Sequence, residues 1–210
     1  MFRNREEAGR QLGAALGGIE MVRPLVLGVP RGGVEIGAAL ARSIGAELDV
    51  VLARKLRAPM QPELAMGAVG EDGSVSVDHE LARAIGATPE MIESERRTQV
   101  EEIQRRGAMI RAVRPAAPLE GRTVIVTDDG IATGSTMIAA LKAAKAKGPY
   151  ELIVAVPVGS PDRLEEIRRH CDRLVCLEAP SRFMAIGQFY EDFSQVPDAR
   201  VLELLRGQAA

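Results

Sequence analysis

Two adjacent carboxylates, Asp128 and Asp129, precede a loop rich in glycine and hydroxyl side chains, and residues 128–136 read DDGIATGST. The glycines let the chain turn tightly at the start of a helix, where backbone N–H groups and the helix dipole favour an anion such as phosphate. The carboxylates would repel phosphate, but they can accept hydrogen bonds from the vicinal hydroxyls of a ribose. We therefore expect a ribose 5-phosphate site. The alternative is an Asp-Gly turn whose Thr or Ser side chain caps the helix.

A second glycine-rich loop follows an apolar run at 25–29 and has the sequence PRGG over residues 30–33. Gly32 and Gly33 allow a ligand to approach the backbone closely, and the guanidinium of Arg31 can bind phosphate oxygens with paired N–H groups. The spacing matches neither G-x-G-x-x-G nor G-x-x-x-x-G-K-[ST], so the loop is neither a dinucleotide fingerprint nor a P-loop. It is a candidate for a different phosphate site.

Three cations, Arg54, Lys55 and Arg57, follow the next apolar run. In isolation, such charges are usually solvated surface residues. Parallel strands, however, deliver the loops that follow them to one edge of the sheet, where ligands of open α/β sheets bind. We therefore expect these cations to meet the PRGG and DDGIATGST loops in one anion-binding site.

The segments that must position these residues are short apolar runs without polar alternation, which is typical of strands buried on both faces of a sheet. Helical patterns separate most of them, and this alternation favours a parallel sheet. We expect an α/β fold, a mostly parallel, doubly wound sheet of about five core strands. The expected strands lie at 25–29, 50–53, 124–127, 152–158 and 174–177.

The span between the second and third expected strands is unusually long. It begins with a glycine- and proline-rich segment that we expect to be an irregular, flexible loop, and a long helix is expected over residues 89–113. Long insertions in a compact domain are usually lids or binding loops. We expect a single domain over 1–210, with a core at about 23–178, the inserted loop and helix at about 56–121, and a small C-terminal hood at about 179–210.

Composition restricts the classes of partner. The chain has 210 residues, 46% of them hydrophobic, and its 27 basic and 29 acidic residues give a net charge of −2. This balance supplies no general field for nucleic acid or an anionic membrane, so neither partner is expected. No apolar run approaches the roughly 18 residues of a membrane span. Cys171 and Cys176 indicate core thiols rather than a disulfide framework or a zinc site, and we expect a cytoplasmic protein.

Taken together, the motifs resemble those of a known family. VIVTDDGIATGST, residues 124–136, is similar to the phosphoribosyl pyrophosphate (PRPP) binding signature of the type I phosphoribosyltransferases. The PRGG loop resembles the pyrophosphate loop of that family. ARKLRAP, residues 53–59, resembles the Arg-Lys segment of its adenine and orotate enzymes. The resemblance covers about residues 23–195, which is most of the chain.

The resemblance implies a role for each motif. Asp128 and Asp129 would be the catalytic pair, holding the ribose hydroxyls and favouring an oxocarbenium-like transition state. Mg2+ would be the cofactor, with both carboxylates as candidate metal ligands, directly or through water. The 5-phosphate would be bound by Gly130, Ala132, Thr133, Gly134, Ser135 and Thr136, and the pyrophosphate by Arg31, Gly32, Gly33, Arg54 and Lys55.

Aromatic residues are concentrated near the C-terminal end, at Phe183, Phe189, Tyr190 and Phe193. A nucleobase needs an apolar face on which to stack. APSRFMAIGQFYEDF resembles the hood segment of hypoxanthine-guanine enzymes, which implies that Phe183 binds the base; the alternative is that these rings anchor the C-terminal segment to the core. The stretch VPVGSP lacks the lysine that contacts the base in those enzymes, so the base stays open.

These observations predict a magnesium-dependent phosphoribosyltransferase of nucleotide metabolism. It would move the 5-phosphoribosyl group from PRPP to a nitrogen of a nucleobase-like acceptor and release pyrophosphate. The alternative is a non-catalytic PRPP-sensing regulatory module, which the low aromatic content and the missing lysine favour. An Asp-based hydrolase is less favoured, because the Asp-x-Asp spacing of phosphatases is absent. The Arg-Lys segment acts across a dimer interface in some relatives, so the resemblance also suggests a homodimer.

Overall fold

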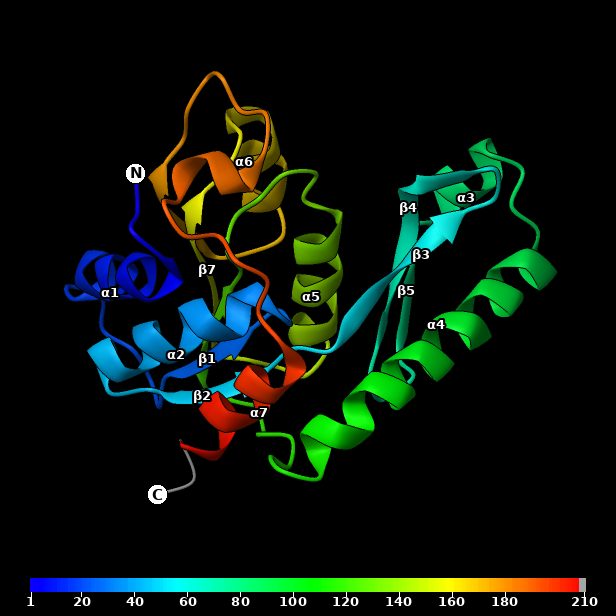
Figure 1. Cartoon of the computed structure of the whole chain (residues 1–210). Coiled ribbons are helices and arrows are strands. Elements are labelled where there is room, and N and C mark those ends of the chain that lie inside the picture. Colours follow the sequence, from blue (N-terminus) through cyan, green and yellow to red (C-terminus); the bar gives the residue numbers. More distant parts are fainter. Residues whose placement is uncertain (208–210) are drawn as a thin grey trace.

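A computed structural model describes residues 1–207, with no side-chain description at positions 62, 63 and 106. Its centre is a five-stranded sheet in the order β2-β1-β6-β7-β8, and each adjacent pair is parallel. Figure 1 shows this sheet among helices, with a smaller sheet to one side. The expected α/β fold is therefore confirmed. The strands are β1 (Leu25–Gly28), β2 (Glu47–Val50), β6 (Thr123–Thr127), β7 (Glu151–Val158) and β8 (Arg173–Glu178).

The sheet separates two apolar cores, because successive side chains of a strand point to opposite faces. In β6, Ile125 belongs to one core, whereas Val124 and Val126 belong to the other. Both faces are covered, which explains why the strand sequences are apolar throughout. The first core is covered by α1 (Arg5–Leu16), α2 (Gly32–Ile44) and α7 (Asp198–Arg206), and the second by α5 (Ser135–Lys145) and α6 (Pro161–Arg168).

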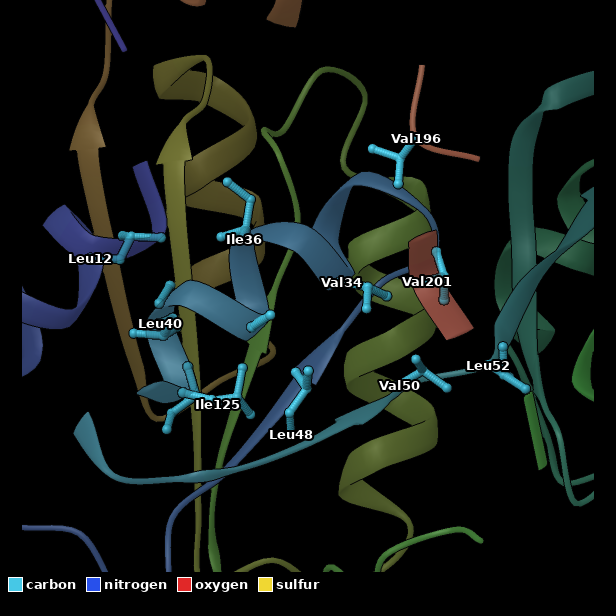
Figure 2. Packing of buried hydrophobic residues seen from close by; sticks show 14 of the residues in the cluster. Leu12, Val34, Ile36, Leu40, Leu48, Val50, Leu52, Ile125, Val196 and Val201 are labelled. Carbon is cyan, nitrogen blue, oxygen red and sulfur yellow. The ribbon is translucent and has the colours of Figure 1, made fainter. Parts of the chain in front are cut away.

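Figure 2 shows the first core, where α2 packs on the sheet. Leu40 of α2 lies close to Ile125 of β6 and Leu48 of β2, and all three are fully buried. Val201 of α7 lies beside Val34 at the start of α2. Because α2 begins just after β1, α7 is docked at the same edge of the sheet as the PRGG loop.

Helices α1 and α7 lie outside the elements expected from the sequence. In α1, two glycines lower the apolar content and the intrinsic helix propensity. They are required by close packing, because a Cβ at Gly9 would lie 2.5 Å from the Ile36 carbonyl oxygen and one at Gly13 would overlap Ser43 of α2. A 3-10 helix, η1 (Ile186–Phe189), lies between β8 and α7.

The inserted segment is folded, in contrast to the irregular loop expected from its glycines and prolines. It forms a three-stranded antiparallel sheet followed by two helices, and the longer helix confirms the one expected at 89–113. Leu56 and Met66 are fully buried here and share a core cluster with Ile103. Two glycines interrupt the apolar pattern of the second strand of this sheet, and three cations obscure the alternation of the first. The elements are β3 (Ala53–Ala58), β4 (Gln61–Gly70), β5 (Val75–Val77), α3 (His79–Ala84) and α4 (Pro89–Arg111).

The second core strand lies earlier in the chain than expected. The predicted bounds 50–53 are wrong, because β2 is Glu47–Val50 and its partner β1 already ends at Gly28, which pairs with Val50. Val51 and Leu52 are buried after the chain has left this sheet, which explains their apolar character. The chain crosses at these residues from the central sheet to the inserted one.

A buried ion pair connects the end of the insertion to the central sheet. Asp49 is 2% exposed and accepts hydrogen bonds from Arg111 Nη1 at 2.7 Å and from the Ala117 N–H at 2.9 Å. Arg111 Nη2 also donates to Glu71 Oε2 at 2.9 Å. Burial alone would lower the pKa of Arg111, but attraction to Asp49 and hydrogen bonding to Glu71 outweigh it and raise that pKa. The last turn of α4 is therefore fixed against β2.

Two further properties of the described chain concern its environment. Among the helices of residues 1–207, none combines the length and apolar character needed to cross a membrane. Cys171 and Cys176 are free and half-buried, and burial raises the pKa of each thiol to about 11. These thiols are therefore poor nucleophiles near neutral pH.

Arg111→Met should leave Asp49 buried without its ion-pair partner. Removing one member of a buried pair typically costs about 3–5 kcal/mol, so we expect the free energy of unfolding to fall by about 3 kcal/mol. Urea unfolding followed by circular dichroism measures the change. Arg97→Met is the matched control, because the Arg97 side chain lies on the same helix and is 70% exposed. Equal stabilities of the two variants would contradict the role given to Arg111.

Candidate active site

A cavity of about 970 Å³ lies where the loops after the core strands meet. Part of its wall comes from Asp128 and Asp129 after β6 and from Arg31 and Gly32 after β1. Other parts of the wall come from β3, α4, the start of α1 and the segment at 193–202, which includes the start of α7. The three segments singled out in the sequence therefore line one cavity.

The two carboxylates are partly exposed and have different partners. Asp128 Oδ1 accepts a hydrogen bond from the N–H of Asp129 at 2.8 Å. Asp129 Oδ2 accepts two hydrogen bonds from Arg5, from Nε at 3.1 Å and from Nη2 at 3.0 Å. The Tyr190 hydroxyl donates to the backbone carbonyl of Asp129 at 2.7 Å. Asp129 is thus fixed at its side chain and its backbone by residues outside its own loop.

Arg5 is a site residue that the sequence motifs did not indicate. It begins α1, is 6% exposed and lines the cavity. Its Nη1 donates to the Ser194 carbonyl oxygen at 2.8 Å, and its guanidinium lies 4.1 Å from the centre of the Phe193 ring. The one signal in the sequence is its helical spacing from the buried residues Ala8 and Leu12. A charged residue on the buried face of a helix needs a buried partner, and here the partner is Asp129.

The electrostatics of the pair follow from burial and proximity. Burial raises the pKa of Asp128 well above its ordinary value, and the charge of Asp129 raises it further. Burial also raises the pKa of Asp129, while the charge and hydrogen bonds of Arg5 oppose the shift. Two carboxylates facing one guanidinium leave an excess of negative charge in a poorly solvated place. Such a site favours a ligand that donates hydrogen bonds or develops positive charge.

The loop between β6 and α5 has unpaired backbone donors. Gly134 adopts a left-handed φ of 79° immediately before Ser135, the first residue of α5. In the part of the chain that the structure describes, no acceptor engages the backbone N–H groups of residues 132–136. The alternative of a Thr or Ser cap is wrong: Gly134 is the N-cap residue, and no side chain caps the helix. These donors at a helix N-terminus form a cradle suited to phosphate.

The PRGG loop lies directly against the two carboxylates. A Cβ at Gly32 would overlap Asp129 Oδ2, and one at Gly33 would lie 2.9 Å from Asp128 Cα. Arg31, next to these glycines, lines the cavity. Both glycines are therefore required by close approach of this loop to the acidic pair, which keeps Arg31 near the carboxylates.

The three cations of the second predicted segment lie on a strand. Arg54, Lys55 and Arg57 belong to β3 of the inserted sheet rather than to a loop at the end of a core strand, and all three line the cavity. Arg54 Nε donates to Gln99 Oε1 at 2.5 Å, and Arg57 Nε donates to Glu95 Oε1 at 3.0 Å. The insertion therefore brings cations to the acidic pair, and α4 orients two of them.

Phe183 is not among the described residues that line the cavity. Its ring stacks on Phe189 with 5.4 Å between the ring centres. The same segment packs on the DDG turn, because a Cβ at Gly130 would lie 2.8 Å from Ile186 Cγ2. Phe193 lines the cavity instead. A base-binding role for Phe183 stays a prediction.

Comparison with known proteins places these motifs in a family. Residues 16–194 match the family model described as the phosphoribosyl transferase domain. The chain belongs to the phosphoribosyl transferase family. The resemblance seen in the loops at 30–33 and 124–136 is therefore confirmed.

Two relatives from Mycobacterium tuberculosis carry names that propose phosphoribosyl transferases: MT0597 of strain CDC 1551 / Oshkosh and Rv0571c of strain ATCC 25618 / H37Rv. Each is 40% identical to this chain over 205 residues, or 98% of the chain. The match covers 46% of each relative, so the chain spans about half the length of the curated relatives it matches.

Solved structures show how far the fold is shared. The crystal structure of TT1426 from Thermus thermophilus is 41% identical and has a TM-score of 0.94, covering 100% of this chain and 99% of that one. The AQ2163 protein from Aquifex aeolicus is 14% identical, with a TM-score of 0.51 over 87% of this chain and 78% of that one, and it shows a similar fold. The Thermus protein therefore shares the fold of this chain along its length, insertion included.

Gly32→Ala should disturb the pair formed by Arg5 and Asp129, because the added methyl group overlaps Asp129 Oδ2. Overpacking typically costs about 1–3 kcal/mol, and we expect the free energy of unfolding to fall by about 2 kcal/mol. Thermal and urea unfolding measure this loss. Gly18→Ala is the matched control, since nothing lies within 4 Å of a Cβ there. Wild-type stability of Gly32→Ala would refute the close packing of this loop.

Asp128→Asn should stabilise the protein at neutral pH. The folded state raises the pKa of Asp128, so the folded chain holds this proton at pH values where the unfolded chain has released it. Wild-type stability therefore decreases as the pH rises from about 4 through the raised pKa. The substitution removes this penalty, and its gain in melting temperature should shrink as the pH is lowered to about 4.

Melting temperatures measured across this pH range test the prediction. Asp162→Asn, which removes an exposed carboxylate at the start of α6, is the control for a general change in net charge. A lower melting temperature of Asp128→Asn at neutral pH would contradict the electrostatic strain assigned to the pair.

Proposed function

We propose that this protein is a magnesium-dependent enzyme that moves the 5-phosphoribosyl group of PRPP to a nitrogen of a nucleobase-like acceptor and releases pyrophosphate. The observation that carries the proposal is one cavity lined by an acidic pair and several cations, with the N–H cradle directly after the acidic pair and reaching the cavity wall at Thr136. A diol donates hydrogen bonds to carboxylates, a phosphate monoester accepts them from N–H groups, and pyrophosphate pairs with arginine and lysine. PRPP carries all three groups.

The acidic pair is assigned to the pentose. As the bond between C1 and the pyrophosphate oxygen breaks, positive charge develops on the ring, and nearby carboxylates stabilise it. Burial raises the pKa of Asp128 and the charge of Asp129 raises it further, which supports this role, because a ring that becomes positive stabilises the charged form of both carboxylates. A nitrogen of the acceptor then forms the new bond to C1.

The remaining contacts are assigned by charge. The loop at 130–136 is assigned to the 5-phosphate, through the unpaired backbone N–H groups of residues 132–136 and the hydroxyls of Thr133, Ser135 and Thr136. Arg31, Gly32 and Gly33 are assigned to pyrophosphate, together with Arg54 and Lys55 of the insertion. The hydrogen bond between Arg54 and Gln99 supports the last assignment, since an oriented guanidinium loses less freedom when it binds an anion.

Magnesium fits the donor set of this cavity. When bound, the ion neutralises charge on the leaving pyrophosphate. Asp128 and Asp129 would hold it, directly or through water, since Mg2+ prefers carboxylate oxygen and both residues line the cavity. Within the described residues, no cluster of three His, Cys, Asp or Glu side chains could bind the ion without further ligands. Pyrophosphate and water are expected to complete its coordination.

The insertion is assigned to water exclusion. An oxocarbenium-like ring reacts readily with water, so the cavity must be shielded while the acceptor is bound. Leu52, Ile103 and Ile110 line the cavity and are buried, and they supply an apolar wall on the side of the insertion. A folded unit of this kind can shield the cavity with less ordering on ligand binding than a flexible loop.

The scarcity of aromatic side chains on the described cavity wall, where an acceptor would stack, supports a second candidate, a PRPP-sensing regulatory module. Phe193 is the aromatic residue on the wall among the residues described, and Arg5 covers one face of its ring at 4.1 Å. This arrangement leaves one face of one described ring on which an acceptor could stack. A sensor would use the same PRPP contacts without an acceptor.

Turnover with magnesium, PRPP and a panel of nucleobases tests the proposal, with pyrophosphate release measured by a coupled assay. We expect release with at least one base, and we expect the double variant Asp128→Asn with Asp129→Asn to slow it by at least about 100-fold. Asp162→Asn should leave the rate unchanged. PRPP binding in calorimetry without release would favour the sensor, and a protein that does not bind PRPP would refute both candidates.

A further inference from the structure

We propose that Arg5 is a positioning residue that holds one oxygen of Asp129 and thereby orients this carboxylate toward the pentose hydroxyls. The inference rests on the proposed function, because it takes the pentose of PRPP as the ligand of Asp129. Arg5 belongs to no recognised motif and lies 124 residues before Asp129 in the chain.

Arg5 engages a single oxygen of its partner. Its Nε and Nη2 both donate to Asp129 Oδ2, at 3.1 and 3.0 Å. Across the described residues, no donor from another residue engages Oδ1 of the same carboxylate. A carboxylate held at one oxygen has a restricted χ2 rotation and keeps the other oxygen for a ligand. Because Asp129 lines the cavity, a pentose hydroxyl in the cavity is a suitable donor to Oδ1.

Arg5 is itself fixed from several directions. Its Nη1 donates to the Ser194 carbonyl oxygen at 2.8 Å, and Nη1 lies 4.0 Å from Glu35 Oε2 of α2. The Phe193 ring covers the guanidinium at 4.1 Å. The arginine side chain is 7% exposed, so few other rotamers are open to it. An arginine that is itself fixed restricts the orientation of the carboxylate that it binds.

The backbone of Asp129 is held separately. Tyr190 donates its hydroxyl to the Asp129 carbonyl oxygen at 2.7 Å, and its ring packs on Phe2 with 5.5 Å between the ring centres. Arg5 therefore has a distinct task, because the turn is anchored without it. Loss of Arg5 should change the orientation of the carboxylate more than the path of the chain.

Binding of ribose 5-phosphate and of pyrophosphate, each measured without magnesium, separates the two parts of the site. Arg5→Lys keeps the positive charge but loses the paired N–H groups on Asp129 Oδ2. We expect it to weaken ribose 5-phosphate and PRPP binding by about 10-fold in calorimetry, and Arg5→Met by more. Pyrophosphate binding should change by less than about twofold, because pyrophosphate lacks the pentose diol.

A matched control comes from the same helix. Arg10 is an exposed arginine of α1 that pairs with Glu6 at 2.9 Å, and Arg10→Met should leave binding of all three ligands unchanged. Chemical rescue adds a measurement whose result would not change if Arg5 had only a structural role. In Arg5→Ala, guanidinium chloride at low millimolar concentration should restore ribose 5-phosphate binding, whereas sodium chloride at the same concentration should not.

The outcomes are distinguishable. Equal weakening of ribose 5-phosphate and pyrophosphate with a lower melting temperature would show that Arg5 only holds the fold, and would overturn the inference. Unchanged ribose 5-phosphate binding in Arg5→Met would also overturn it. If the wild-type protein bound neither PRPP nor ribose 5-phosphate, the proposed function itself would fail, and the inference with it.

Discussion

The burial of two adjacent carboxylates at the end of β6 is the constraint on which the site depends. Burial disfavours both charges and raises the pKa of Asp128 and of Asp129. The fold can keep such a pair only if other groups offset part of the cost. Arg5 supplies an opposite charge, and the Asp129 N–H supplies a hydrogen bond to Asp128. The Gly32 position must then lack a side chain, because Asp129 Oδ2 takes up that space.

The same constraint explains why distant parts of the chain meet at this edge of the sheet. Arg5 needs an acceptor at Ser194 and a ring at Phe193, so the C-terminal segment must be docked before the arginine is fully held. α1 can reach the site because its glycines let it approach α2 closely. Packing against the core and charge compensation in the site are therefore parts of one arrangement.

How much could be predicted from the sequence depends on how local each signal is. The strands of the central sheet and the loops at 30–33 and 128–136 could be placed. Neighbouring residues are enough to show an apolar run that is buried on both faces and a turn that is rich in glycine and hydroxyl side chains. The bounds of β2 could not, because the apolar Val51 and Leu52 are buried outside that sheet. The inserted sheet was missed because two glycines interrupt the apolar pattern of β4 and three cations obscure the alternation of β3. Arg5 was missed because a contact across 124 residues leaves no local pattern.

The position of the insertion has a consequence for which parts of the fold can vary independently. It leaves the central sheet after Val50 and is fastened at its far end by Arg111 to Asp49, so both attachments belong to β2, a strand at the margin of the sheet. Inner strands β1 and β6 carry the acidic pair and the glycine loops, and their pairing does not involve the insertion. The insertion can therefore be exchanged or remodelled while the inner strands stay intact, because the loops that carry the acidic pair and the glycines follow strands whose pairing is independent of it.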